Sequence, residues 1–153
     1  MIKTVHHAGV GVRDEKMLKE MLHFYCDLLG LQVDGEVEYP EGELVDKAVD
    51  VENANLKVIH LTPPGAESWW DGGVELCYYS SPEPKEWRGG TRQCDGGLIH
   101  LALVVEDLQG MYERLVKEGV TFNTEPLNLG THVIVYMRDP DRNTVELMEY
   151  LRE

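Results

Sequence analysis

Two histidines and two glutamates recur at matching places in the two halves of this chain: His7 and Glu75, then His100 and Glu146. Each glutamate is the centre of the same tripeptide, Val-Glu-Leu, inside an apolar segment. A charged side chain there is costly to bury unless it is paired or binds a metal. Because imidazole nitrogen and carboxylate oxygen together suit Zn, Ni, Co, Mn or Fe(II), we predict one divalent metal bound by these four residues.

The place of each histidine in its predicted strand supports this prediction. Side chains alternate across a strand, so His7 shares a face with Gly9, and His100 shares one with Ala102. The opposite faces carry branched apolar side chains, which a helix would cover. We therefore expect the histidine faces to line a shared open cup. One such histidine alone would usually be structural, and it is the matching of two pairs that favours a metal.

The elements that would position these residues also repeat. Apolar strands at 5–12 and 98–105 each precede an amphipathic helix with an aspartate at its N-cap, Asp14 or Asp107. The interval from His7 to Asp14 equals that from His100 to Asp107. Gly30 and Gly119 end the helices. Further strands are predicted at 31–37, 56–61, 74–79, 120–122, 132–137 and 144–151.

Each half therefore has the order β-α-β-β-β. We predict an α+β fold in which two βαβββ modules form a cupped, mostly antiparallel eight-stranded sheet around the metal site. Residues 1–80 would be the first module, 81–96 a linker rich in proline and glycine, and 97–153 the second module, all in one structural domain. The polar segment before the strand at 56–61 is expected to be a loop.

The remaining histidines are weaker candidates. His6 adjoins His7, but strand alternation places it on the opposite face. His60 and His132 lie in or at predicted strands without partners at matching positions, and His23 is expected on the surface of the first helix.

Composition limits the classes of function. With 28 acidic and 14 basic residues, the net charge of −14 disfavours nucleic-acid and membrane partners. No apolar run reaches the length of a membrane span and no signal-peptide pattern is present, so a cytoplasmic location is expected. The three cysteines lack CxxC spacing, which indicates thiols rather than a disulfide framework.

A small anionic substrate is compatible with a local basic cluster, Lys85, Arg88 and Arg92. Three loop tryptophans would either contact substrate or cap the core edge: Trp69, Trp70 and Trp87.

Several of these segments resemble the vicinal oxygen chelate superfamily, which includes glyoxalase I, methylmalonyl-CoA epimerase, extradiol dioxygenases and bleomycin-resistance proteins. Residues 7–14 (HAGVGVRD), with Phe24-Tyr25 and Leu29-Gly30-Leu31 after them, are similar to the family's opening strand, helix and "FY…LGL" segment. Residues 99–102 (IHLA) and 139–147 (DPDRNTVEL) are similar to its "H-x-A" strand and "DPDGN-x-x-EL" closing hairpin. The segment 36–50 matches no subfamily signature.

The resemblance implies a metal bound by one residue from each of four strands, which carries over onto His7, Glu75, His100 and Glu146. Arg142 stands where the family usually has glycine, so the turn conformation there is open.

The expected function is a metal-dependent isomerase, epimerase or lyase that removes a proton next to a carbonyl through a metal-bound enolate. Its small-molecule substrate would be a 2-hydroxycarbonyl or an acyl thioester. By similarity to the family's lyases, Glu146 is the catalytic base and Glu75 its counterpart. One alternative is an Fe(II) extradiol ring-cleaving dioxygenase, against which a fourth protein ligand argues. Another is a small-molecule binding or sequestration protein, which would need no metal ligands. A homodimer is also expected.

Overall fold

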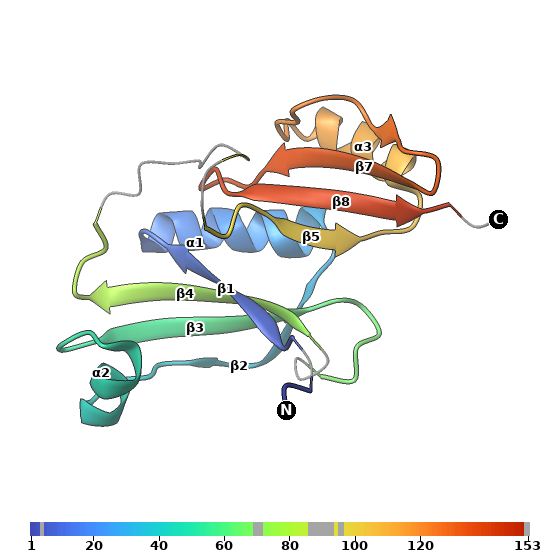
Figure 1. Ribbon diagram of the computed structural model, residues 1–153. Helices are drawn as coiled ribbons and strands as arrows, with labels where there is room; N and C mark the ends of the chain where they lie inside the picture. Colours follow the sequence, from blue (N-terminus) through green and yellow to red (C-terminus); the bar gives the residue numbers. More distant parts are fainter. Residues whose placement is uncertain (4, 69–71, 86–93, 95–96, 152–153) are drawn as a thin grey trace. The chain divides into compact units, whose positions relative to one another are not determined.

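The computed structural model of the chain describes residues 1–3, 5–68, 72–85, 94 and 97–151. The chain forms two compact units, Met1–Arg88 and Gly89–Glu153. Each unit contains its own four-stranded sheet (Figure 1). The module bounds 1–80, 81–96 and 97–153 stay a prediction, since much of the segment 81–96 lies outside the described residues.

The first unit begins with strand β1 (His7–Val12) and helix α1 (Glu15–Leu22), which continues as the π-helical segment η1 (His23–Leu28). The rest of the unit is β2 (Gln32–Glu38), α2 (Glu43–Val49), β3 (Asn55–Thr62) and β4 (Gly73–Ser81). The strand order in the sheet is β1-β4-β3-β2, with β1 parallel to β4 and the other neighbours antiparallel.

The second unit repeats this order without a counterpart of α2. Its elements are β5 (Leu101–Val104), α3 (Leu108–Lys117), β6 (Leu127–Asn128), β7 (His132–Arg138) and β8 (Thr144–Tyr150). The sheet has the order β5-β8-β7-β6, again with the first strand parallel to the last. The predicted α+β class with two βαβββ modules is therefore confirmed. The eight strands form two four-stranded sheets and not one closed barrel.

The helical segment formed by α1 and η1 begins and ends where the sequence predicts, although its second part is π-helical. The Asp14 carboxylate accepts the backbone N–H of Met17 at 2.7 Å, which satisfies one of the unpaired donors of the first turn. The apolar face buries Met17, Leu18 and Met21, and each fully buried side chain of this size contributes about 1.5–3 kcal/mol. Gly30 follows the helix with φ +85°, a conformation that favours glycine.

Helix α3 is attached to the last strand of its own sheet. The Asp107 carboxylate accepts the N–H of Gly110 at 3.1 Å, and Glu149 of β8 accepts the N–H of Leu108 at 2.9 Å. Two carboxylates at a helix N-terminus also interact favourably with the helix dipole. A side-chain hydrogen bond thus connects the N-terminus of α3 to β8.

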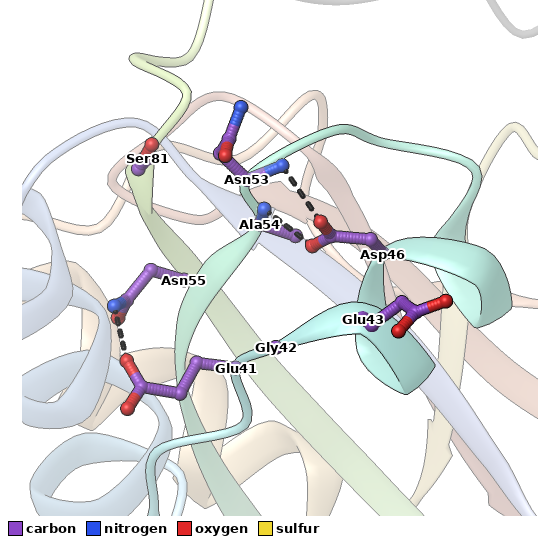
Figure 2. A pocket seen from close by; sticks show the side chains of 8 residues that line it. All are labelled: Glu41, Gly42, Glu43, Asp46, Asn53, Ala54, Asn55 and Ser81. Atoms are coloured by element: carbon purple, nitrogen blue, oxygen red, sulfur yellow. Dashed lines mark hydrogen bonds between the residues drawn. The ribbon is translucent and has the colours of Figure 1, made fainter.

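The segment predicted as a polar loop contains helix α2, so that prediction was wrong. The Asp46 carboxylate accepts the N–H groups of Asn53 at 2.9 Å and Ala54 at 2.7 Å, and closes the connection to β3 (Figure 2). Val45 and Val49 pack against buried residues of β3. A helix this short is not stable by itself. Tertiary contacts that the sequence pattern does not reveal therefore stabilise it.

The predicted strand at 120–122 was also wrong. In the structure only Phe122 forms an isolated bridge, to Met137, and the paired edge strand is Leu127–Asn128. The N–H of Val120 instead bonds the carbonyl of Leu115 at the end of α3, which keeps this residue at the helix terminus. Strand β5 is shorter than the predicted 98–105.

Candidate metal centre

The first His–Glu pair lies on neighbouring strands of the first unit. His7 begins β1 and Glu75 lies in β4, and the distance from His7 Nε2 to Glu75 Oε1 is 3.9 Å. Along β1 the residues on the histidine face are exposed, while those on the other face become progressively buried toward Val12. His7 therefore lies on the exposed face of β1, opposite the face that buries Val12. A methyl group at Gly9 would meet Glu75 Oε1 only at ordinary contact distance, so alanine would also fit there.

The second pair has the same arrangement in the second unit. His100 directly precedes β5, and its Nε2 is 3.3 Å from Oε2 of Glu146 in β8. The Glu146 side chain is buried, with 10% of its area exposed. Ala102 on the histidine face is exposed, whereas its neighbours Leu101 and Leu103 are half-buried. The predicted alternation therefore holds here as well.

Strand pairing opposite each glutamate adds residues that the sequence did not single out. In the antiparallel ladders His60 of β3 is directly opposite Glu75, and Tyr136 of β7 is directly opposite Glu146. Directly opposed residues share a face and their side chains interact. His60 and Tyr136 are thus counterparts in the two units. His60 had been set aside because no second histidine matched it, and the counterpart is a residue of another type.

The Tyr136 hydroxyl is close enough to the Glu146 carboxylate for hydrogen bonding between them to affect its pKa. Burial, the negative charge of Glu146 and this hydrogen bond raise the pKa of Tyr136 above its usual value, so the hydroxyl stays protonated as a donor at neutral pH. The ring also contacts the His100 imidazole edge to face, with 5.6 Å between centroids. A buried carboxylate needs such partners to offset its desolvation.

Glu75 has its own donor. The Cys77 thiol, on the same face of β4, donates to Glu75 Oε1 at 3.0 Å. Burial, followed by the hydrogen bond and the charge of Glu75, raises the pKa of Cys77 to about 12. The thiol is thus a neutral hydrogen-bond donor to Glu75 in this structure.

His6 does not lie where the sequence predicts. Its Nδ1 is 2.8 Å from Nδ1 of His7, and the two rings meet edge to face, whereas alternation had placed them on opposite faces. The reason is that β1 begins only at His7, so strand geometry does not extend to His6. The contact leaves Nε2 of His7 as the nitrogen nearer to Glu75.

The other candidates stay apart from these pairs. His23 lies on the exposed face of η1 and pairs with Asp27 at 2.7 Å, as expected for a surface residue. His132 contacts Thr131 and the Tyr150 ring. Some residues singled out in the sequence lie outside the described part of the chain: Trp69, Trp70, Trp87, Arg88 and Arg92.

The two pairs can be compared with the spacing of two adjacent ligands of one metal. Donor atoms about 2.1 Å from a common ion lie roughly 3.0–3.4 Å apart at tetrahedral or octahedral angles. The His100–Glu146 distance of 3.3 Å falls in this range, whereas the His7–Glu75 distance of 3.9 Å lies above it. Among the described residues no group of three or more His, Cys, Asp or Glu side chains is placed to hold a metal. The structure therefore shows two two-donor sets, one in each unit.

A hollow in the first unit, beside α2, is lined by the carboxylates of Glu41, Glu43 and Asp46 (Figure 2). Glu41 accepts a hydrogen bond from the Asn55 side chain, and Asp46 closes the loop to β3. These carboxylates thus have structural roles.

In the part of the chain that the structure describes, no helix has the length and apolar character needed to cross a membrane.

The fold thus has two βαβββ units, and each unit has a His–Glu pair at an equivalent position. These two features define a class of protein. The chain belongs to the Glyoxalase/Bleomycin resistance protein/Dioxygenase superfamily, whose family model matches residues 4–147. A relative from Synechocystis named "Probable lactoylglutathione lyase" is 28% identical over 149 residues, covering 94% of this chain and 92% of the relative.

Solved structures agree on the fold. A glyoxalase family protein from Bacillus cereus superposes with a TM-score of 0.84 at 18% identity, covering 99% of this chain and 97% of the other. TnmS3, an antibiotic binding protein from Streptomyces, superposes with a TM-score of 0.64 at 20% identity, covering 98% of each chain. The same fold thus occurs in proteins with different described roles.

Proposed function

We propose that the protein is a metal-dependent lyase or isomerase that removes a proton next to a carbonyl group of a small molecule. The observation that carries this proposal is the His–Glu pair at the same strand register in both units. A binding protein has no need for two such pairs, one of which contains a buried carboxylate. The relative named for lactoylglutathione supports a 2-hydroxyacyl thioester as a substrate class.

The metal ligands in this proposal are His7 and Glu75 together with His100 and Glu146. Two neutral imidazoles and two carboxylates balance the charge of a divalent cation of the series Zn, Ni, Co, Mn or Fe. When bound, the metal supplies Lewis acidity that polarises a substrate carbonyl and makes the neighbouring C–H more acidic.

Glu146 is the proposed base. Its carboxylate is buried, and its orientation is held by Tyr136 and by His100, so it accepts a proton from a defined direction. Glu75, with Cys77 and His60 around it, is the counterpart for a proton on the opposite side of the substrate carbon. General acid–base groups contribute roughly 100- to 10,000-fold to rate.

The decisive experiment follows hydrogen exchange in heavy water. Protein loaded with each metal in turn is incubated with lactoylglutathione, and NMR follows deuterium entering the carbon next to the thioester carbonyl. We expect exchange without oxygen consumption, and a loss of at least about 100-fold in Glu146→Gln with metal content measured beside the rate. The surface variant Glu125→Gln is the matched control and keeps the wild-type rate.

Other outcomes point to the alternatives. Oxygen uptake with catechols, and no exchange with any 2-hydroxycarbonyl or thioester, would identify an Fe(II) ring-cleaving oxygenase. Binding of small molecules without metal uptake or exchange would identify a sequestration protein. The proposed homodimer is tested by sedimentation, and the proposed cytoplasmic location by fractionation of the source cells.

A further inference from the structure

His60 lies between two carboxylates in the first unit. Its side chain is only 5% exposed, with Nδ1 3.6 Å from Glu75 Oε2 and Nε2 3.5 Å from Glu38 Oε1. Glu38 ends β2 and has 58% of its side chain exposed. The imidazole thus connects a carboxylate at the surface with the carboxylate of the first His–Glu pair.

An apolar residue would fill this position more easily. Val58, the preceding residue on the same face of β3, is buried and apolar, and burying an imidazole beside it costs free energy unless its polar atoms have partners. Both ring nitrogens face carboxylate oxygens. The contacts of its ring nitrogens with carboxylates, and not packing alone, therefore explain why a histidine occupies position 60.

The two oxygens of Glu75 face different neighbours. Oε1 accepts the Cys77 thiol and is the oxygen nearer to His7, whereas Oε2 faces His60. A carboxylate contacted at both oxygens loses rotational freedom about its last torsion. It then presents the same oxygen to His7 before any metal arrives, and this preorganisation is how groups around a metal ligand raise affinity.

We propose that His60 is a positioning residue that fixes the orientation of the Glu75 carboxylate, with Glu38 orienting the imidazole. The effect of this positioning on metal affinity rests on the proposed function. The second unit supports this role independently, because Tyr136 occupies the same register position, directly opposite Glu146. Both units thus place a polar side chain directly across the ladder from the glutamate.

The first test measures Co²⁺ affinity by calorimetry in the full-length protein. His60→Ala should bind roughly 10- to 100-fold more weakly, the usual loss when a partner of a metal ligand is removed. Asparagine places its amide near the position of Nδ1, and glutamine places it near Nε2. His60→Asn should therefore recover most of the affinity and His60→Gln little, while His132→Ala, at a half-buried histidine of β7, should match the wild type.

The visible absorption of bound Co²⁺ in His60→Asn should keep the wild-type form, since the ligands are unchanged. Unchanged affinity in His60→Ala would overturn the proposal, as would recovery by glutamine but not by asparagine. A changed Co²⁺ spectrum in His60→Asn would make His60 a ligand and would also overturn it. Circular dichroism checks folding, and the asparagine variant keeps the test valid if the alanine variant does not fold.

The second test needs no metal, which separates this proposal from the proposed function. Long-range ¹H–¹⁵N spectra of the metal-free protein report the ring nitrogens of each histidine. Glu75→Gln should shift the His60 signals and leave those of His132 in place. If the wild type binds no metal, the proposed function fails, and the contact is judged by these spectra alone. An unmoved His60 signal would overturn the positioning role.

Discussion

Glu75 and Glu146 occupy the same place in their units, since the register pairs Glu75 with Gly9 and Glu146 with Ala102. In each case the paired residue lies two positions after the histidine that contacts the glutamate. In the proposed metal site each unit contributes one such donor pair with the same strand register. Loss of either histidine should therefore have a similar effect.

His100→Ala should lower metal affinity by more than the roughly 10- to 100-fold that loss of an outer-shell partner costs. The fold should persist, because His100 precedes β5 and its side chain is partly exposed. The control is His23→Ala, which removes an exposed histidine of η1. Calorimetric titration with Zn²⁺ or Co²⁺ measures both. Equal loss of metal in the two variants would show that the assignment of the ligands is wrong.

Tyr136→Phe should destabilise the fold by about 0.5–1.5 kcal/mol, the usual net worth of one hydrogen bond, since Tyr136 is only half-buried and water screens its interaction with Glu146. The Glu146 carboxylate keeps its buried position but loses the hydroxyl donor. Urea unfolding followed by circular dichroism gives the free energy of unfolding. Tyr39→Phe, at an exposed tyrosine, should leave it unchanged. A stability equal to the wild type in Tyr136→Phe would mean that this hydrogen bond contributes nothing.

Arg142→Gly should stabilise the protein by about 0.5–1 kcal/mol. Arg142 has φ 70°, in the left-handed region that costs a residue with a side chain roughly 1–2 kcal/mol, part of which the greater chain entropy of glycine offsets. The turn itself is held by Asp139, whose carboxylate accepts the N–H of Asn143 at 2.8 Å. Thermal unfolding should show the gain in Arg142→Gly and none in Arg142→Ala. An equal gain in stability in both variants would mean that the gain results from loss of the arginine charge.

Cys77 should resist alkylation at pH 9, while the exposed Cys94 reacts. Thiolate is the reactive form, and a pKa of about 12 leaves Cys77 almost wholly protonated at that pH. Glu75→Gln removes the charge and the carboxylate acceptor that raise this pKa, so the pKa falls and Cys77 should react faster. Mass spectrometry of iodoacetamide-treated peptides measures each site. Faster labelling of Cys77 than of Cys94 in the wild type would contradict the contact with Glu75.

The sequence by itself determined the repeat and the His–Glu pairs within it. Alternation along β1 and the aspartate N-caps act over a few residues, so local patterns were sufficient to predict the face of His7 and the start of α1. The contacts of His7 with Glu75 and of His100 with Glu146 followed from matching the halves, because a duplicated unit repeats its strand register.

Only the tertiary structure decided which residues surround the glutamates. His60 and Tyr136 become equivalent through antiparallel pairing between strands distant in sequence, and that register is set by the packing of whole sheets. Helix α2 depends in the same way on Val45 and Val49 meeting the buried face of β3. Such contacts have no local periodicity, and they form only when the chain closes on itself.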